Sequence, residues 1–295
     1  MIDFIELLLK NDLSIAYKED FDFSKNSTIG VGGKAKIVFY PTTIKELIAL
    51  VDLLEENNAP YLVLGNLSNV LPPDQYLEKA IILTTKLTSI EFAKSVFVSA
   101  GVTSGALIRA CAKNGKTGAE FLAGIPCTIG GATYMNAGAG GKYISDIVKR
   151  VLVYKQRRLC ILTKKECEYG YKTSVFMKNG GIILGVELEL DDALEEEILS
   201  NQKNVLATRN WLPKGRSMGC VFKNPLGESA GKLIEGAGLK GLRNGGAVVS
   251  EIHANFIINE KNATQNEVLE LIRIIKNAVF AQYKIILEEE IEIID

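Results

Sequence analysis

The fold of this chain is organised around the stretch Glu120-Phe-Leu-Ala-Gly-Ile-Pro-Cys-Thr-Ile-Gly-Gly-Ala-Thr-Tyr-Met-Asn-Ala-Gly-Ala-Gly-Gly141. Glycine adopts positive φ angles and lets a backbone come close to a partner, and successive free N–H groups in such a turn form a concave donor site for anions. The stretch is too apolar for a linker and too rich in glycine for an ordinary helix or strand. Two interpretations remain open: a tight turn across a packed interface, or a cradle for a dinucleotide or phosphate group.

The composition bounds the class of protein. The chain has 295 residues, 47% of them hydrophobic, and a mean hydropathy of +0.13, which indicates one large globular domain or two to three smaller ones. A formal net charge of -1 gives no reason to expect nucleic acid or an anionic membrane as a partner. No apolar stretch is long enough to span a bilayer.

The first residues and the cysteines indicate the compartment. Residues 1–10 carry acids where a signal peptide carries bases, and their apolar spacing predicts a short amphipathic helix. We therefore expect a cytoplasmic protein whose five cysteines are reduced thiols. The cysteine spacings fit no zinc pattern, and a single histidine cannot make a histidine-rich site, so no metal is expected.

Strand and helix patterns alternate along the chain. The capping signal Thr43-x-x-Glu46 starts a helix between strands at 35–40 and 61–64. The turn 65–69 follows the second strand, at the carboxyl end where α/β sheets bind ligands, although a plain connection is the simpler interpretation of that turn alone.

The later segments also carry helix and strand patterns. Residues 192–210 form a charged helix and a plausible boundary, and Thr264-x-x-Glu267 caps a long amphipathic helix that ends near Tyr283. Residues 285–295 alternate apolar and acidic side chains, which predicts a half-buried strand. The other predicted elements are strands at 80–83, 95–99, 150–154, 159–162, 182–190 and 254–259, helices at 103–114 and from 229, and loops at 169–174 and 213–219.

Several separated motifs occur in one order over nearly the whole chain. They are Ile29-Gly-Val-Gly-Gly33, Leu64-Gly-Asn-Leu-Ser-Asn69, Gly124-Ile-Pro-Cys-Thr-Ile-Gly-Gly-Ala-Thr-Tyr-Met-Asn-Ala-Gly138, Tyr171-Lys-Thr-Ser174, Gly219-Cys-Val-Phe-Lys-Asn-Pro225, Ser229-Ala-Gly-Lys-Leu-Ile234, Val249-Ser-Glu-Ile-His-Ala-Asn-Phe-Ile-Ile-Asn259 and the terminal Glu290. Together they resemble the UDP-N-acetylenolpyruvoylglucosamine reductase (MurB) family in its shorter, type II form. One glycine-rich loop is weak evidence, whereas this ordered series is specific.

The resemblance implies an α+β fold with a two-part FAD-binding module of the MurB and vanillyl-alcohol-oxidase-like type, followed by a C-terminal α+β substrate domain. It implies FAD-binding subdomains at 1–79 and 80–205 and a substrate-binding domain at 206–295, with the last strand at 285–295 packing back toward the FAD module. It also implies non-covalent FAD, NADPH as co-substrate and a UDP-sugar as substrate. A monomer is expected.

The reaction of that family has two halves. NADPH reduces FAD, and reduced FAD gives a hydride to the enolpyruvyl ether of UDP-N-acetylglucosamine enolpyruvate while an acid protonates the neighbouring carbon, which yields UDP-N-acetylmuramate for the cell wall. Charge that develops on the substrate carboxylate needs a cation and hydrogen-bond donors, and the carbon needs a proton donor. The aligned catalytic residues are Lys172, Cys220 and Glu290.

The resemblance implies further contacts with the two ligands. The cofactor-binding residues are Gly65, Asn66, Leu67, Ser68, Asn69, Pro126, Thr128, Gly130, Gly131, Ala132 and Asn136. The substrate-binding residues are Tyr171, Ser174, Asn224, Lys232 and His253.

Four positions depart from the family pattern. Lys172 replaces an arginine, which keeps the charge but loses the planar fork, and Cys220 replaces a serine with a more acidic thiol. Leu67 and Cys127 stand where glycine is usual. The alternative is therefore a degenerate relative that binds FAD or a nucleotide without reductase activity, and a third interpretation is a related flavoprotein oxidoreductase with another substrate.

Each candidate residue also has a simpler interpretation. Lys172 and Glu290 would be solvated surface charges, Cys220 an inert buried thiol, and His253 a hydrogen-bonded core histidine. The resemblance favours the functional interpretation over these.

Overall fold

The computed structural model describes residues 2–295, which form two compact units. The first unit contains residues 2–18, Ile37–Asn66 and Lys79–Asn210, and the second contains Glu19–Lys36, Leu67–Glu78 and Trp211–Asp295. Each unit is therefore built from segments that lie far apart in the sequence. The predicted subdomain boundaries after residues 79 and 205 stay predictions.

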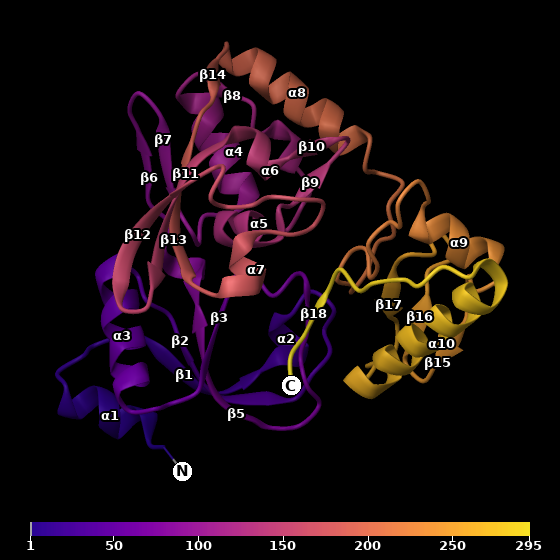
Figure 1. Cartoon of the computed structure of the whole chain (residues 1–295), viewed down its shortest axis with the longest axis horizontal. Coiled ribbons are helices and arrows are strands. Elements are labelled where there is room, and N and C mark those ends of the chain that lie inside the picture. Colours follow the sequence, from indigo (N-terminus) through magenta and orange to yellow (C-terminus); the bar gives the residue numbers. More distant parts are fainter. Residues whose placement is uncertain (1) are drawn as a thin grey trace. The chain divides into compact units, whose positions relative to one another are not determined.

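Helices and strands are interspersed along the chain (Figure 1). The helices are α1 Phe4–Lys10, α2 Phe23–Asn26, α3 Ile44–Glu56, α4 Ser104–Lys113, α5 Ile129–Met135, α6 Ile144–Ile147, α7 Val175–Asn179, α8 Glu195–Ala207, α9 Ala230–Gly236 and α10 Gln265–Tyr283, with 3-10 turns at Thr84–Lys86 and Glu120–Leu122. The strands are β1 Tyr17–Asp22, β2 Lys34–Phe39, β3 Tyr61–Leu64, β4 Val70–Leu71, β5 Leu77–Leu83, β6 Ile90–Phe92, β7 Val96–Ser99, β8 Lys116–Thr117, β9 Gly138–Ala139, β10 Lys142–Tyr143, β11 Val148–Lys155, β12 Arg158–Thr163, β13 Ile182–Leu188, β14 Asp191–Asp192, β15 Arg243–Asn244, β16 Ala247–Val249, β17 Ile257–Asn259 and β18 Glu292–Ile293.

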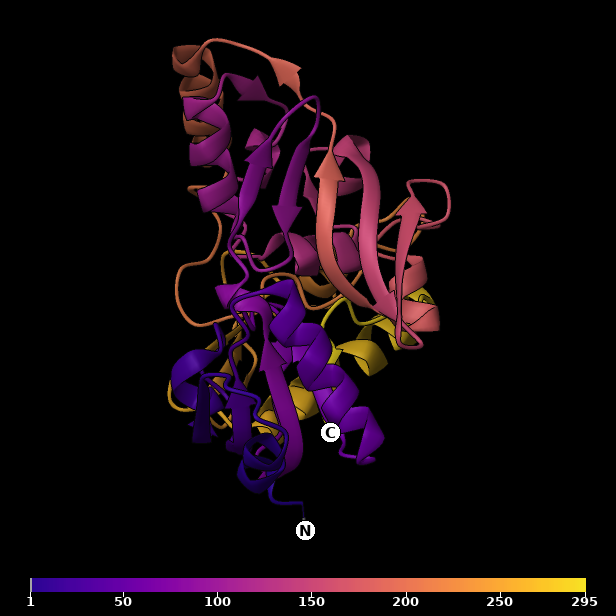
Figure 2. The ribbon, with the colours of Figure 1, turned by 90° about the vertical axis from the view of Figure 1, so that its left-hand side faces the viewer.

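An antiparallel sheet of order β12-β11-β13-β7-β6 is the framework of the first unit (Figure 2). Its β-branched residues, such as Val98, Val151 and Val186, are buried in one core with Ile129 of α5 and Leu107 of α4. Valine and isoleucine pack well on a pleated surface. α5 therefore lies on the sheet, and α8 lies along α4 (Figure 1).

A second core of the first unit surrounds α3. Leu47, Leu50 and Leu54 of this helix are buried together with Tyr154 and Leu184 of the large sheet. β3 pairs in parallel with β5, from Tyr61 opposite Ala80 to Leu64 opposite Leu83, within a sheet of order β1-β2-β5-β3. The turn that begins at residue 65 thus leaves the carboxyl end of a parallel strand.

The second unit has its own core around α10. This helix lies against the antiparallel sheet β15-β16-β17 (Figure 1) and buries Leu271 and Ile275 with Ile257, Phe222 and Ile29. β18 pairs in parallel with β4, with Glu292 opposite Val70 and Ile293 opposite Leu71. Segments near residues 30 and 70 are thus joined to the C-terminal segment within one core.

The structure confirms most of the predicted elements and corrects some. α1, α3, α4, α8, α9, α10 and the strands near 35–40, 61–64, 80–83, 95–99, 150–154, 159–162 and 182–190 lie where the sequence predicted them. The glycine stretch was wrongly judged unable to form a helix, because it contains α5. The strand predicted at 285–295 is regular only at β18, and that predicted at 254–259 only at β17.

Both helix caps predicted from the sequence form, one of them with a different partner. Thr264 and Glu267 make the reciprocal capping box at the start of α10. The Thr43 hydroxyl accepts from the Glu46 N–H at 3.1 Å, but the Glu46 carboxylate accepts from the N–H of Thr42, at 2.8 Å. Within residues 2–295, no helix is long and apolar enough to cross a membrane.

Candidate active site

The glycine-rich segment of the first unit forms the start of α5. The Thr128 hydroxyl caps this helix by accepting from the Gly131 N–H at 3.2 Å. A Cβ on Gly130 would lie 2.8 Å from the Cβ of Ala100, whereas a Cβ on Gly131 would meet only the Thr128 Oγ1, at 3.3 Å. Gly130 therefore allows α5 to pack on its neighbour, and Gly131 leaves one side of the helix start open.

The first half of the turn 65–69 is held against that helix start. The Asn66 amide donates to the Pro126 carbonyl at 2.9 Å, and a Cβ on Gly65 would lie 2.4 Å from the Thr128 Oγ1. The predicted cofactor residues Gly65, Asn66, Pro126 and Thr128 therefore lie together in the first unit.

The second half of the turn belongs to the second unit and contains Leu67 in a left-handed conformation. Its φ is 51°, where a residue with a Cβ is disfavoured by about 1–2 kcal/mol. The leucine side chain is buried, and its carbonyl accepts from the Thr28 N–H at 3.3 Å. Burial of this side chain offsets the strain that glycine would avoid.

Several polar groups of the turn 65–69 and of α5 have no hydrogen-bond partner among the described residues. The backbone N–H groups of residues 65–69 donate no hydrogen bond to any residue that the structure describes. On α5, the buried Thr133 hydroxyl likewise has no partner among residues 2–295. Consecutive N–H groups without a protein partner in a turn favour an anion, so the turn 65–69 fits a phosphate group such as those of FAD.

The loop that carries Lys172 is a tight turn. Gly170 and Thr173 exchange backbone hydrogen bonds of 3.1 and 3.4 Å, and Lys172 between them has a φ of 51°. The buried Ser174 hydroxyl donates to the Tyr134 carbonyl at 2.6 Å. Tyr171 is exposed, so Tyr171 and Lys172 form the tip of the turn and Ser174 anchors its base.

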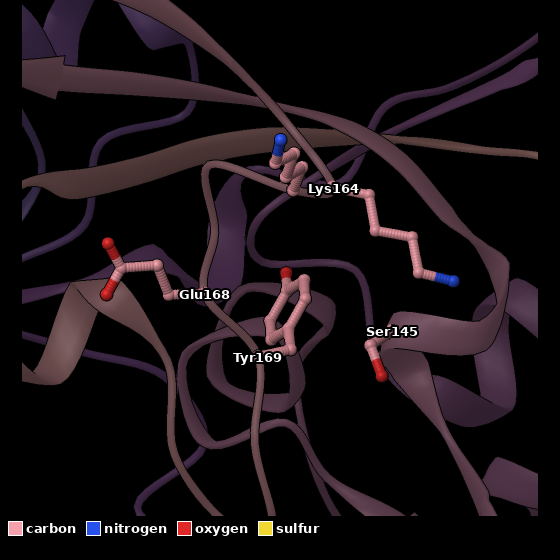
Figure 3. A pocket seen from close by; sticks show the side chains of 5 residues that line it. Ser145, Lys164, Glu168 and Tyr169 are labelled. Carbon is pink, nitrogen blue, oxygen red and sulfur yellow. The ribbon is translucent and has the colours of Figure 1, made fainter.

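A surface pocket of about 520 Å³ lies beside this loop and is lined by Ser145, Lys164, Lys165, Glu168 and Tyr169 (Figure 3). The Tyr169 hydroxyl is buried without a hydrogen-bond partner among the described residues, and burial, followed by the nearby Cys167, raises the pKa of Tyr169. No residue of the predicted site is among those that line this pocket. It is therefore a separate feature from the predicted ligand contacts.

In the second unit, the segments that carry Cys220 and Glu290 are hydrogen-bonded neighbours. The Glu290 N–H donates to the Val221 carbonyl at 2.7 Å, and Phe222 forms a bridge with Glu289. Cys220 in turn bridges Phe256. Both Cys220 and Glu290 are partly exposed, so the structure brings these two predicted catalytic positions into one paired region.

Two asparagines hold that region in place. The buried Asn255 amide accepts from the Phe222 N–H at 2.9 Å and donates to the Phe222 carbonyl at 2.8 Å. The Asn69 amide donates to the Glu290 carbonyl at 3.0 Å. Asn69, which was predicted as a cofactor contact, thus lies beside the predicted catalytic residue Glu290. The sequence analysis did not identify Asn255. Its place in the Val249–Asn259 motif was the only available signal.

The predicted substrate residues Asn224, Lys232 and His253 gather around α9. The Asn224 side-chain oxygen accepts from the Ala230 N–H at 3.0 Å, and Lys232 is exposed on the first turn. A Cβ on Gly231 would lie 2.9 Å from the His253 Cε1, which shows how closely the imidazole approaches the helix.

His253 lies between two aromatic rings. Trp211 stacks on the imidazole at 5.5 Å with an interplanar angle of 14°, and Phe256 lies 5.1 Å away. The imidazole Nδ1 accepts from the Asn255 N–H at 3.2 Å, so the neutral ring carries its proton on Nε2. Burial lowers the pKa of His253, which keeps this ring a neutral donor at pH 7. Trp211 was missed, although it is the only tryptophan in the chain.

Each unit thus gathers its own share of the predicted residues. In the first unit, Gly65, Asn66, Pro126, Thr128, Gly130, Gly131 and Ala132 lie near the start of α5, and Asn136, Tyr171, Lys172 and Ser174 lie near its end. In the second unit, Leu67, Ser68, Asn69, Cys220 and Glu290 share one region, and Asn224, Lys232 and His253 surround α9. No cluster of three or more histidine, cysteine, aspartate or glutamate side chains within residues 2–295 could hold a metal ion.

Comparisons with known proteins match both parts of the chain. The family model described as UDP-N-acetylenolpyruvoylglucosamine reductase, C-terminal domain, matches residues 212–294, and the model described as FAD binding domain matches residues 35–157. The UDP-N-acetylenolpyruvoylglucosamine reductase of Clostridioides difficile (strain 630) is 38% identical over 299 residues, which cover 99% of this chain and 97% of that protein. The same-named protein of Bacillus velezensis is 36% identical over 94% of this chain and 93% of its own length.

A solved structure agrees with these sequence matches. The crystal structure of UDP-N-acetylenolpyruvylglucosamine reductase (MurB) from Thermus caldophilus is 35% identical to this chain and superimposes with a TM-score of 0.80. The match covers 96% of this chain and 99% of that one.

Proposed function

Because the chain belongs to the UDP-N-acetylenolpyruvoylglucosamine reductase family, we propose that it reduces the enolpyruvyl ether of UDP-N-acetylglucosamine enolpyruvate to UDP-N-acetylmuramate, with NADPH as the reductant. This makes it an FAD-dependent oxidoreductase of peptidoglycan precursor synthesis. We place the reaction in the cytoplasm, with a monomer as the working form. Its product serves cell wall biogenesis and hence cell shape and cell division.

The residues present fit FAD, which when bound supplies the hydride to the substrate. The unused N–H groups of residues 65–69 would hold its pyrophosphate. Residues 128–132 would lie along it, because Gly131 leaves the start of α5 open. These contacts require backbone donors rather than particular side chains, which is consistent with leucine at position 67.

The observation that carries the proposed chemistry is the pairing of the Cys220 and Glu290 segments. In the proposed step a hydride adds to one carbon of the enolpyruvyl double bond, and the Cys220 thiol gives its proton to the adjacent carbon. The thiolate left behind is reprotonated from solvent. Glu290, on the neighbouring segment, orients the reacting group.

Charge on the substrate is managed by residues at the tip of the Lys172 turn and around α9. The Lys172 ammonium would stabilise negative charge on the substrate carboxylate as the hydride arrives, with Tyr171 beside it. Lys232 would pair with the UDP diphosphate. His253, as a neutral donor through Nε2, would hydrogen-bond the same substrate without adding charge.

The test is direct and separates the proposed function from its alternative. The purified protein should show a flavin spectrum, and denaturation should release all of the flavin. NADPH absorbance should fall faster when UDP-N-acetylglucosamine enolpyruvate is added, and mass spectrometry should detect UDP-N-acetylmuramate. Bound flavin without substrate-dependent NADPH oxidation would instead identify a degenerate binding protein.

A further inference from the structure

Asn136 ends α5 in a way that uses both atoms of its side-chain amide. It is 4% exposed and has left-handed backbone angles, φ 46° and ψ 54°. Its Nδ2 donates to the Gly170 carbonyl at 2.8 Å, and its Oδ1 accepts from the Ser145 N–H at 3.2 Å. One buried side chain therefore joins α5, the start of α6 and the turn that carries Lys172.

The same end of α5 holds the Lys172 turn at a second point. The Ser174 hydroxyl donates to the Tyr134 carbonyl at 2.6 Å. Gly170 and Ser174 flank the tip of the turn, and Gly170 also pairs with Thr173. The backbone around Lys172 is therefore fixed at its base by groups of residues 134 and 136.

α5 also connects this anchor to the predicted cofactor cradle. The helix has seven residues between its caps Thr128 and Asn136, a length of about 10 Å at the α-helical rise per residue. Its first turn contains Gly130 and Gly131, and its last turn holds the Lys172 loop. A short helix packed on a sheet is stiff, so the two ends keep a constant separation.

We infer that Asn136 is a positioning residue for Lys172, which sets the place of the substrate-facing ammonium relative to the cofactor through the Gly170 carbonyl. The inference rests on the proposed function. It differs from the direct cofactor contact predicted from the motif, because the side chain is buried and its observed bonds join it to the Gly170 carbonyl and the Ser145 N–H. A role as a helix cap alone does not explain these two side-chain hydrogen bonds either, since glycine satisfies a left-handed C-cap without a side chain.

The substitution Asn136→Asp tests the hydrogen bond from Asn136 Nδ2 to the Gly170 carbonyl. Aspartate tolerates the left-handed conformation and keeps an acceptor for the Ser145 N–H. It loses the donor and places a carboxylate oxygen against the Gly170 carbonyl, so the turn is pushed away from α5. The matched control is Asn114→Asp at the end of α4, where Asn114 Nδ2 donates to the Ala110 carbonyl at 2.9 Å in an exposed position.

The experiment is a double-mutant cycle with Lys172→Met, measured by stopped flow on the FAD-loaded enzyme. Asn136→Asp should slow reoxidation of the reduced flavin by substrate about tenfold or more, since small misplacements of a catalytic group are costly. Flavin content and reduction by NADPH should stay unchanged, and Asn114→Asp should behave as wild type. In the Lys172→Met background, Asn136→Asp should add little, because the group that it positions is already absent.

The outcomes separate this inference from the proposed function. Wild-type turnover with the UDP-substrate tests the function alone, and its absence would overturn both. If the wild type turns over but the two substitutions multiply, Asn136 acts independently of Lys172 and the inference is wrong. Loss of flavin from the Asn136→Asp protein would also overturn it, because the side chain would then serve the cofactor or the fold.

Discussion

Cys220 is the residue on which the proposed proton transfer depends. A cysteine thiol carries an S–H proton that it can donate to a neighbouring carbon. Cys220→Ser should keep useful activity, because a hydroxyl also carries a proton that it can donate. Cys220→Ala should leave FAD reduction by NADPH intact and slow flavin reoxidation by substrate about a hundredfold, within the usual range for a general acid.

Cys127 provides the control for that measurement. The Cys127 side chain is buried, and burial raises the pKa of its thiol to about 11. The thiol is therefore protonated at neutral pH. Cys127→Ala should therefore leave the rate of flavin reoxidation by substrate unchanged. Stopped-flow traces in which Cys220→Ala reacts with substrate as fast as wild type would exclude Cys220 as the acid.

Glu187 joins β13 to β11 and to the residue that precedes β7, and it makes the stability of the first unit depend on pH. Its carboxylate accepts from the Arg150 side chain at 2.6 Å and from the Ser95 hydroxyl at 2.5 Å. The hydrogen bond from Arg150, followed by those from Ser95 and Lys149, lowers the pKa of Glu187 to about 2 against the opposing effect of burial.

A folded-state pKa below the unfolded value stabilises the fold at every pH above the unfolded value. That stabilisation is lost as the pH falls from about 4.5 through 2. Glu187→Gln should lower the free energy of unfolding at pH 7 by about 1–2 kcal/mol, and chemical denaturation should show this difference shrinking toward pH 2. The matched control is Glu6→Gln, which removes an exposed i,i+4 pair with Lys10 and should be nearly neutral. A difference that stays constant from pH 7 to pH 2 would contradict this account.

Single residues also show where sequence-based prediction reaches its limit. Leu67 and Asn136 both lie in motifs of the sequence, and their contact with the cofactor stays a prediction, but a one-dimensional pattern does not give φ or the partner of an amide. The strain at Leu67 and the bond from Asn136 to Gly170 depend on segments up to about forty residues away. Trp211 belongs to no motif and becomes notable only through its stack on His253.

At the scale of elements, α5 shows why local propensity failed. Glycine is about 1 kcal/mol less favourable than alanine within a helix, so a segment with Gly130 and Gly131 is a poor helix by itself. Burial of Ile129, Ala132 and Met135 and the Thr128 cap supply what propensity lacks. The prediction of an anion cradle at this stretch did not require the helix and stays a prediction.

The two neighbouring glycines of α5 give a matched pair of substitutions. Gly130→Ala places a methyl group 2.8 Å from the Ala100 Cβ and 3.0 Å from its carbonyl oxygen, so it should destabilise the protein with or without flavin. Gly131→Ala meets only the Thr128 Oγ1, at 3.3 Å, and should leave the flavin-free protein as stable as wild type while lowering its flavin content. Thermal melts and flavin absorbance test both. Full flavin occupancy in Gly131→Ala would show that the cofactor does not approach this side of α5.

The segment 285–295 failed as a prediction for a different reason. Its alternation of apolar and acidic residues is typical of a strand, and its apolar side chains Leu287 and Ile291 are indeed buried. The backbone, however, changes partner within a few residues: Glu288 and Glu290 bond to the segment 221–223, whereas Glu292 bonds to Asn69. Alternation predicts which side chains are buried but not whether one neighbouring strand continues alongside.

For the whole molecule, the only tryptophan offers a direct report on the second unit. Trp211 is 58% exposed and stacks on His253, which is predicted to contact the UDP-substrate. UDP added to the flavin-free protein should change the fluorescence of this tryptophan, and inorganic pyrophosphate should compete with UDP. Lys232→Ala should weaken the competition by inorganic pyrophosphate, because it removes about 1–3 kcal/mol of charge-assisted binding to the phosphate groups.

The control for this titration is Trp211→Phe, which should abolish the signal and leave UDP binding by calorimetry nearly unchanged. If UDP binds by calorimetry and the fluorescence of Trp211 does not respond, the UDP-substrate lies away from the His253 stack.

The order of the motifs predicted the family of the protein, because the motifs related to the cofactor and those related to the substrate both occur along one chain. The discontinuous composition of the units was not predictable from that order. Residues 19–36 and 67–78 join the C-terminal segment because Ile29 and Leu71 are buried against Phe222 and Leu271. Helical and strand periodicity shows that a side chain is buried but not which distant core receives it.

The pairing of β4 with β18 has a consequence for the synthesis of the protein. Residues 70–71 find their strand partner only at residues 292–293, so on a ribosome that adds about 5–20 residues per second the wait lasts on the order of ten to forty seconds. Every segment of the first unit lies at or before Asn210, so this unit can begin to fold while the rest of the chain is still being translated. The second unit can be completed only late in translation. Its early segments emerge with exposed apolar residues and an unpaired strand edge, which is the state that chaperones bind. Glu290 reaches its neighbours only when translation of residues 2–295 is almost complete.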